Sequence, residues 1–540
     1  MPDNLTQGVA AGARLSVTAQ QIYAIMQPYA LTAQQQAAVE QAPVTSPSLV
    51  VAGAGSGKTE LMAVRVLWLV ANGYATPEQI LGLTFTRKAA SELSNRIFKS
   101  LLVLRDSQYW PKDLGYDFAQ PTVTTYNSYA NTLFRDYALG LGYESESTLI
   151  TEAAAFQLAR EVVLKFGSQV DSRLADLDLN LDSLVKLVLE LAAEMNDNLV
   201  AAQDIEDLNE SILQRLGQLP KKSGGIDFSQ FAYYGQLLEP LPITTIVAKL
   251  ADAYRSEKHR LGYVDYSDQV ALAERAVRQI PQAKERERQR FTQVLLDEYQ
   301  DTSVLQTRLL ANLFGQQSVF AVGDPNQSIY GWRGASSSNL TAYGTDFAQG
   351  FEGQVQEPGP GAILAKRFEL ATSWRNPKAV LTLANHLAQP LRSQASYLPP
   401  QQWQLQPVAL NARQDALQGV IGVAFEPDLL QEAATVADWF AARMKGAQAS
   451  GDSDKQPTAA LLMRNRTNMP VFLKAMQDRG LAVEVIGLGG LLEVPEIVDL
   501  VAALQVVHDP SRGSELVRLL TGARWRIGAK DIDRLHRFAK

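Results

Sequence analysis

The sequence has 540 residues, of which 46% are hydrophobic and 20% charged, with a formal net charge of −7 and no cysteine. This length exceeds what one core supports and predicts roughly two to four domains. The lack of cysteine excludes disulfides, thiolate metal sites and cysteine nucleophiles. No apolar run approaches the roughly 20 residues of a membrane span, and residues 1–14 lack the pattern of a secretory signal, so we expect a cytoplasmic protein. Because the net charge is negative, any nucleic acid would have to bind in a local basic groove and not on a globally basic surface.

Residues 1–27 are expected to form a short helical extension. Residues 31–39 predict a helix that Thr32 caps and that Ala37, Ala38 and Val39 make apolar on one side. A glutamine amide offers both a donor and an acceptor, which suits an adenine edge. Most glutamine-rich helices are merely solvated, but this one directly precedes a phosphate-binding pattern.

That pattern follows the apolar run at residues 49–51 and precedes the apolar helix predicted over residues 61–70. It consists of Ala52, Gly53, Ala54, Gly55, Ser56, Gly57, Lys58 and Thr59. A strand, a glycine-rich turn and a helix in this order are the setting of a phosphate loop, in which backbone N–H groups and the helix N-terminus attract phosphate. Lys58 would reach the β- and γ-phosphates, and Thr59 would hold Mg²⁺. The first glycine of the G-x-x-x-x-G-K-S/T pattern is Ala52 here, and a small residue still fits.

Residues 80–85 predict a buried strand, after which Thr86 opens a helix with Arg87 and Lys88 on its outer face. Threonine and basic residues at a strand end are suited to phosphate-backbone contacts, although an ordinary solvated helix face has the same composition. Another strand is predicted over residues 122–126. Residues 129–290 then read as an inserted all-helical subdomain, in which the function of the stretch 262–268 is not readable from its chemistry.

The α/β pattern resumes at residues 293–301, where Asp297 and Glu298 end an apolar strand. Two carboxylates at the end of an apolar strand cost folding free energy, which favours a functional role for them. The alternative interpretation is that they only cap the end of the strand. In a protein with a phosphate loop, the first carboxylate holds Mg²⁺ and the second activates a water.

A further strand at residues 318–322 leads into a loop that carries Gln327, Tyr330, Trp332 and Arg333. Aromatic and arginine side chains in loops hold single strands by stacking on bases. A core aromatic turn is the alternative, and it suits Tyr330 better than Trp332.

Residues 344–361 are expected to form a long loop, and residues 369–377 lead into another helix. A second α/β pattern then begins. Its strands are predicted at residues 458–463 and 483–486, and its helices at residues 471–480 and 496–507.

Taken together, from about residue 28 onward, these motifs resemble the UvrD/Rep-type superfamily 1 DNA helicases, in the family's order. Three strings, at residues 83–90, 373–376 and 522–528, look closest to AdnB-type motor subunits of bacterial helicase–nucleases. The resemblance implies an α/β fold: a RecA-like parallel-sheet domain (28–128 and 290–376) with a helical insertion (129–289). A partial second RecA-like domain (377–510) and the start of a second helical insertion (511–540) would follow.

The resemblance also implies roles for individual residues. Gln35 would read adenine and Trp374 would stack on it; Gln327 would sense the γ-phosphate, and Arg375 would neutralise it from the second motor domain. The residues implied to line the single-strand path are Thr86, Tyr330, Trp332 and Arg333. Two positions depart from the family, because Glu60 stands where several relatives have arginine near the nucleotide, and Asn127 where many have histidine.

The implied activity is ATP- and Mg²⁺-dependent 3′-to-5′ translocation on single-stranded DNA, with unwinding of duplex DNA, in repair or recombination. An AdnA-like second subunit is an implied partner. The family's late arginine-rich E-R-R-L-x-Y-V-A-x-T-R motif and its T-x-H…K-G-L-E stretch are not found before Lys540. We therefore expect a truncated chain that binds ATP but turns it over poorly and does not unwind DNA. The alternatives are a non-catalytic nucleotide-dependent DNA-binding module and an RNA helicase.

Overall fold

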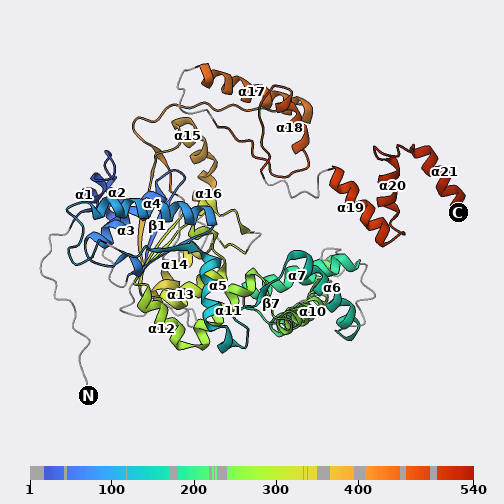
Figure 1. Cartoon of the computed structure of the whole chain (residues 1–540), viewed down its shortest axis with the longest axis horizontal. Coiled ribbons are helices and arrows are strands. Elements are labelled where there is room, and N and C mark those ends of the chain that lie inside the picture. Colours follow the sequence, from blue (N-terminus) through green and yellow to red (C-terminus); the bar gives the residue numbers. More distant parts are fainter. Residues whose placement is uncertain are drawn as a thin grey trace. The chain divides into compact units, whose positions relative to one another are not determined.

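The computed structural model describes residues 17–41, 46–116, 118–170, 180–217, 222–223, 226–227, 240–331, 334–336, 338–349, 365–394, 408–449, 458–486 and 495–539. The chain divides into two compact units, Met1–Val420 and Ile421–Lys540, which are described separately (Figure 1).

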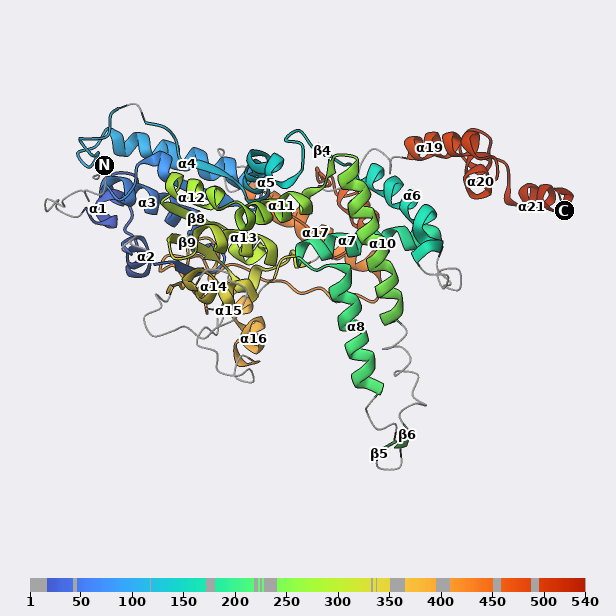
Figure 2. The same cartoon turned by 90° about the horizontal axis from the view of Figure 1, so that it is seen from below.

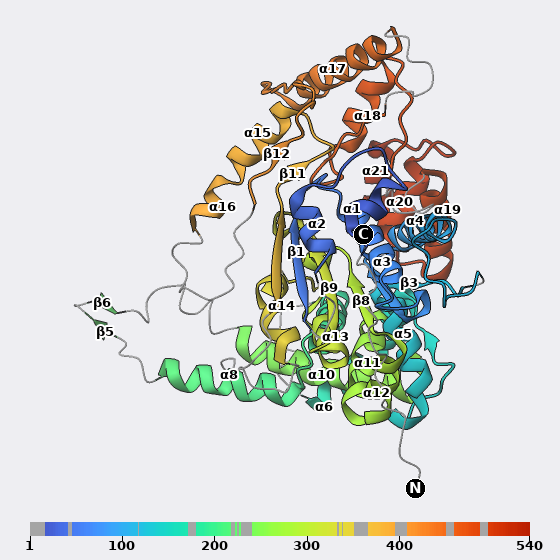
Figure 3. The same ribbon diagram turned by 90° about the vertical axis from the view of Figure 1, so that its left-hand side faces the viewer.

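Unit 1 is built on a six-stranded parallel sheet with the strand order β10-β1-β9-β8-β2-β3 (Figure 3). The strands are β1 (Ser48–Ala52), β2 (Ile80–Thr84), β3 (Thr122–Thr125), β8 (Gln293–Leu296), β9 (Ser318–Gly323) and β10 (Lys366–Leu370). Four of them, β1, β2, β8 and β9, are buried along their whole length. Burial on both faces explains why these strands are continuous apolar runs without alternation. The α/β fold expected from the sequence is confirmed.

Helices cover both faces of this sheet. Val50 packs in one core with α3 (Lys58–Ala71) and α4 (Arg87–Arg105). Its neighbours Leu49 and Val51 pack in the other core, because successive residues of a strand point to opposite faces. The helices of that second core are α5 (Tyr126–Tyr137), α11 (Tyr266–Gln279), α13 (Val304–Phe314) and α14 (Ser338–Gln349). Since all six strands run parallel, the loops that follow them meet at one edge of the sheet.

Two short helices precede the sheet, α1 (Ala19–Ala24) and α2 (Ala33–Val39). Thr32 caps α2 as expected, and it does so in a reciprocal capping box with Gln35.

The stretch expected to be a helical insertion contains helices with a core of their own, apart from the six-stranded sheet (Figure 1). They are α6 (Glu152–Val170), α7 (Leu181–Asp197), α8 (Ala202–Gly217) and α10 (Pro240–Arg260). In Figure 2, α8 lies alongside α10. The chain returns to the sheet through α11 and α12 (Pro281–Arg290).

A buried ion cluster joins these helices to α11. The Lys258 ammonium of α10 lies 2.7 Å from Asp268 Oδ2 and also contacts Asp265, which caps α11. Asn196 Nδ2 of α7 donates to Asp268 Oδ1 over 2.8 Å. The stretch 262–268, to which we assigned no role from the sequence, thus supplies two carboxylates that connect the helical insertion to α11. We call this ion cluster the joint.

After β10, unit 1 continues through β11 (Thr372–Ser373), α15 (Lys378–Leu387), α16 (Gln389–Gln394) and β12 (Asn411–Ala412). The long loop expected from residue 344 is wrong for residues 344–349, which form the end of α14. Residues 350–361 lie outside the described residues.

Unit 2 contains the helices α17 (Leu429–Ala449), α18 (Met469–Gln477), α19 (Pro495–His508), α20 (Gly513–Thr521) and α21 (Ala529–Ala539). The helices expected at residues 471–480 and 496–507 are α18 and α19. The strands expected at residues 458–463 and 483–486 are wrong, since neither segment pairs with another in the described part of the unit. Apolar sequence favours an extended backbone, but a strand also needs a partner, and Leu462 is 91% exposed.

Across the described ranges, we find no helix that combines the length and the apolarity needed to cross a membrane.

Candidate nucleotide site and nucleic-acid face

The phosphate loop connects β1 to α3 at the edge where the strands end. Gly55 and Gly57 have φ of +76° and +85°, a left-handed conformation that glycine adopts without strain. Gly57 occupies the N-cap of α3 without a side-chain cap, so the first N–H groups of the helix are left for an anion. Ala52 is the buried last residue of β1, where its methyl group is accommodated.

The acidic pair follows β8 at the same edge. Lys58 Nζ lies 2.9 Å from Glu298 Oε2, which joins residues 240 positions apart in the sequence. Glu298 has φ of +47°, an uncommon conformation for a residue other than glycine and one that marks functional sites. Asp297 is buried, and burial together with the neighbouring Glu298 charge raises its pKa to about 6. The fold therefore places two carboxylates near the phosphate loop. That of Asp297 is buried, and that of Glu298 is paired with Lys58.

Gln327 lies after β9, the strand next to β8. Its Nε2 donates to Asp324 Oδ2 over 2.5 Å. Gln300, to which we assigned no role from the sequence, donates to Glu298 Oε2 over 2.8 Å and accepts from the Asp324 N–H over 3.0 Å. The one feature of the sequence that could have pointed to Gln300 is its position two residues after Glu298, within the stretch 293–301.

The segment after β10 lies against the phosphate loop. The Trp374 N–H donates to Gly55 O over 2.7 Å, and the Ser373 hydroxyl donates to Ala54 O over 2.9 Å. A Cβ atom at Gly55 would lie 2.7 Å from Arg375 Cβ, so Gly55 is also required by close approach. The structure therefore brings the backbones of both Trp374 and Arg375 to the loop.

Gln35 completes the group. It is 7% exposed, its Nε2 donates to Ser56 O over 3.3 Å, and its Oε1 accepts from the Thr32 N–H.

Glu60, one of the two departures from the family, pairs with Arg96 of α4 at 2.5 Å.

Basic and hydroxyl side chains gather beside this site, where β2 and β3 end. The Thr86 hydroxyl caps α4 by accepting from the Ala89 N–H over 3.0 Å, and Arg87 and Lys88 follow it. A pocket of about 340 Å³ is lined by Arg87, Ala90, Ser91, Ser94, Asn95, Val123, Thr124, Thr125 and Ser128. The serines and Asn95 of this pocket carry hydroxyl and amide groups of the kind that contact phosphates, and we did not single them out from the sequence.

Of the two aromatic residues expected to contact DNA bases, Tyr330 lies within the described residues. Tyr330 stacks on Phe85, with ring centroids 4.6 Å apart, so the loops after β2 and β9 meet. Asn127, the second departure, accepts from Gln306 Nε2 over 2.7 Å. Trp332 and Arg333 lie outside the described residues.

Comparison with known proteins agrees with this geometry. Residues 31–348, more than half of the chain, match the family described as UvrD/REP helicase N-terminal domain. The chain belongs to the UvrD/REP helicase family.

Three relatives illustrate the match. A probable DNA helicase II homolog of Rickettsia felis is 28% identical over 59% of this chain and 41% of its own length. DNA helicase II of Salmonella typhimurium is 25% identical over 90% of this chain and 56% of its own length. The ATP-dependent DNA helicase PcrA of Staphylococcus epidermidis is 22% identical over 91% of this chain and 56% of its own length. The chain thus spans about half the length of these relatives.

The metal expected at such a site can be tested against the residues present. Within the described ranges no group of three or more acidic or histidine side chains could hold a metal ion. Mg²⁺ needs less, because it is bound by one or two carboxylates together with substrate phosphates and water. Asp297, which follows β8, offers a carboxylate, and Thr59, which follows Lys58 at the start of α3, offers a hydroxyl, and these groups fit that requirement.

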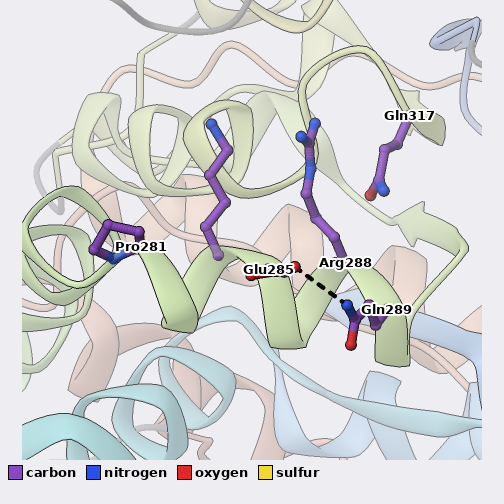
Figure 4. A pocket seen from close by; sticks show the side chains of 6 residues that line it. Pro281, Glu285, Arg288, Gln289 and Gln317 are labelled. Atoms are coloured by element: carbon purple, nitrogen blue, oxygen red, sulfur yellow. Dashed lines mark hydrogen bonds between the residues drawn. The ribbon is translucent and has the colours of Figure 1, made fainter. Parts of the chain in front are cut away.

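A second pocket, of about 390 Å³, lies along α12 (Figure 4). It is lined by Pro281, Lys284, Glu285, Arg288, Gln289 and Gln317. Gln317 directly precedes β9, so this pocket lies at the opposite edge of the sheet from the phosphate loop. It is therefore not part of the nucleotide site of this UvrD/REP family chain.

Proposed function

We propose that the chain contributes to the activity of an ATP-dependent DNA helicase, which moves 3′ to 5′ on single-stranded DNA and unwinds duplex DNA in repair or recombination. The observation that carries this proposal is the meeting of Lys58 and Glu298 on the phosphate loop, with Gln327, Trp374 and Arg375 at the same edge. Membership of the UvrD/REP family supports it, and the polarity rests on the resemblance alone.

In this proposal the adenine lies between Gln35 and Trp374, and Lys58 leaves Glu298 to bind the phosphates. Thr59 and Asp297 hold Mg²⁺, which when bound neutralises charge on the phosphates. Glu298 accepts a proton from the attacking water, Gln327 senses the γ-phosphate, and Arg375 neutralises charge that develops on it.

DNA would cross the adjoining face. Thr86, Arg87 and Lys88 would contact its backbone together with the hydroxyl and amide groups of the 340 Å³ pocket. Tyr330, Trp332 and Arg333 would line the path of the bases. Trp332→Ala is expected to weaken single-strand binding by about 1–3 kcal/mol, the usual worth of one base–aromatic stack, and similarly for all sequences.

The test is ATP hydrolysis by the purified chain with and without single-stranded DNA, beside Lys58→Ala and Glu298→Gln. Lys58→Ala should lose nucleotide affinity, whereas Glu298→Gln should bind ATP normally but not turn it over, because glutamine cannot accept the proton. Strand displacement from substrates with 3′ or 5′ tails tests the polarity. Parent-like hydrolysis by Glu298→Gln would show that the assignment of the base is wrong.

The same experiment separates the rival function. A non-catalytic module would bind nucleotide and DNA without hydrolysis in the parent chain as well as in the variants. An RNA helicase would be stimulated by single-stranded RNA and not by DNA, since stacking and phosphate contacts do not themselves distinguish the sugars.

A narrower proposal is an AdnB-type motor with an AdnA-like partner, and it rests on the strings at residues 83–90, 373–376 and 522–528. Co-purification of the chain with an AdnA-like subunit as one stable complex is the measurement that decides it.

A further inference from the structure

A buried glutamine connects the two halves of the proposed hydrolysis site. The Gln300 residue is 1% exposed, and its amide bridges two loops. Its Nε2 reaches Glu298 Oε2 after β8, and its Oε1 accepts from the Asp324 N–H after β9. Asp324 in turn accepts from Gln327 Nε2. A continuous chain of hydrogen bonds therefore runs from the proposed base to the proposed γ-phosphate sensor.

The backbone around Gln300 is fitted to this bridge. The Ser328 hydroxyl donates to Gln300 O over 3.1 Å, which ties the loop after β9 to the same residue. A Cβ atom at Gly323 would lie 3.0 Å from Gln300 Oε1 and 3.4 Å from Gln300 N. The amide therefore occupies the space that a side chain at residue 323 would need.

Glu298 Oε2 accepts from both Lys58 and Gln300, at 2.9 and 2.8 Å. In the proposed mechanism Lys58 leaves Glu298 to bind the phosphates, and Gln300 then remains hydrogen-bonded to Glu298. Both contacts use Oε2, so Oε1 is the oxygen that neither donor occupies and that can face a water. Glu298 sits in a strained backbone conformation, and a fixed side-chain contact is what such a residue needs to keep one orientation.

We propose that Gln300 is a positioning residue, which holds the Glu298 carboxylate toward the attacking water and couples its position to Gln327. This inference rests on the proposed function. In the step it serves, the water oxygen bonds to the γ-phosphorus, the bond to the bridging oxygen breaks, and the water proton passes to Glu298. Gln300 neither gains nor loses a proton.

The experiment compares Gln300→Leu with a matched control, Gln293→Leu. Gln293 is also a buried glutamine of the β8 segment, and it bonds to the neighbouring strand through Ser318 over 2.6 Å, but at the opposite edge. We expect kcat of Gln300→Leu to fall about 10²-fold, the scale of a misplaced catalytic group. The dissociation constant of a fluorescent ATP analogue should change less than about threefold, and the melting temperature no more than in the control.

Two further measurements separate positioning from a merely structural role. Gln300→Leu combined with Gln327→Ala should be no slower than the slower single variant, because both act through one chain of bonds. Hydrogen exchange in nucleotide-free protein should quicken at least tenfold in a peptide covering Asp324 in Gln300→Leu but not in Gln293→Leu, since the Asp324 N–H loses its acceptor. This second readout does not depend on turnover.

Control-like kcat and exchange in Gln300→Leu, or losses that multiply in the double variant, would overturn the proposal. If Gln300→Leu does not fold, Gln300→Asn keeps a buried amide that is too short to reach both loops, and it should show the same losses. Parent-like hydrolysis by Glu298→Gln would instead refute the proposed function, so the two failures are distinguishable.

Discussion

At the scale of single residues, we expect Asp346 to make the stability of unit 1 depend on pH. Burial on α14 raises the pKa of this carboxyl to about 7. Between about pH 4 and pH 7 the folded state holds a proton that the unfolded state has released, so the free energy of unfolding falls as pH rises through this window. Asp346→Asn should remove the part of this dependence that Asp346 contributes and stabilise the protein at pH 8 by about 2–4 kcal/mol.

Urea unfolding at pH 5 and pH 8 measures the effect, with exposed Asp136→Asn of α5 as the control. Equal changes between the two pH values in parent and Asp346→Asn would contradict the assignment.

The individual site residues differ in how far the sequence could predict them. Lys58, Asp297 and Glu298 stand in motifs whose chemistry is readable locally, and the fold then brings Lys58 and Glu298 within 2.9 Å. Gln300 was not predicted, because its role depends on Asp324 after another strand. A side-chain bridge between two loops has no local signature. Tyr330 was left open between a stacking and a core role, and its contact with Phe85 is compatible with both.

At the scale of elements, the buried parallel strands were predictable, because burial on both faces demands continuous apolar runs such as residues 49–51 and 318–322. Apolar runs also led us to predict strands at residues 458–463 and 483–486, and these predictions were wrong. An apolar run specifies an extended, buried segment only if a neighbouring strand pairs with it, and pairing is not encoded in the run itself. The end of α14 was missed for a related reason, since its helical residues merge into a glycine- and proline-rich stretch.

The joint between the helical insertion and α11 is expected to depend on Lys258. Its side chain is 3% exposed, and its ammonium pairs with the Asp265 and Asp268 carboxylates. Lys258→Met leaves these two carboxylates without their cation in a buried setting, which typically costs about 3–5 kcal/mol of the free energy of unfolding. Urea denaturation followed by circular dichroism is the measurement.

The matched control is Lys249→Met on the same helix. Lys249 pairs with Glu206 at 2.6 Å, but its side chain is 43% exposed. Ion pairs of this kind contribute about 0–1 kcal/mol, so the control should lose little. Similar losses in both variants would show that the joint does not depend on the buried charge.

At the scale of the whole molecule, a net charge of −7 means that DNA affinity must come from local cations. Arg87→Ala and Lys88→Ala are each expected to weaken single-strand binding similarly for all sequences. Each should also reduce the slope of log affinity against log salt by about 1, because one phosphate contact and its released counterion are lost. Fluorescence anisotropy at several salt concentrations measures the slope, and exposed Lys186→Ala of α7 is the control. Unchanged slopes in both variants would remove the start of α4 from the DNA path.

Unit 2 carries large apolar side chains on extended segments that do not pair within its described part. Phe425 is 98% exposed and Leu462 is 91% exposed. Scattered exposed apolar residues are ordinary, but a group of them on unpaired extended backbone favours association between molecules. We therefore expect the 540-residue chain to bind a hydrophobic dye and to self-associate as its concentration rises.

Replacing Phe425 and Leu462 with serine should lower dye fluorescence and shift sedimentation toward the monomer. Nucleotide affinity should not change, because Lys58 and its partners belong to unit 1. Leu139→Ser is the control, since Leu139 is also exposed, at 79%, but lies in a short helical turn of unit 1. If the control and the double variant reduce association equally, the effect comes from removing any exposed apolar side chain and not from the extended segments of unit 2.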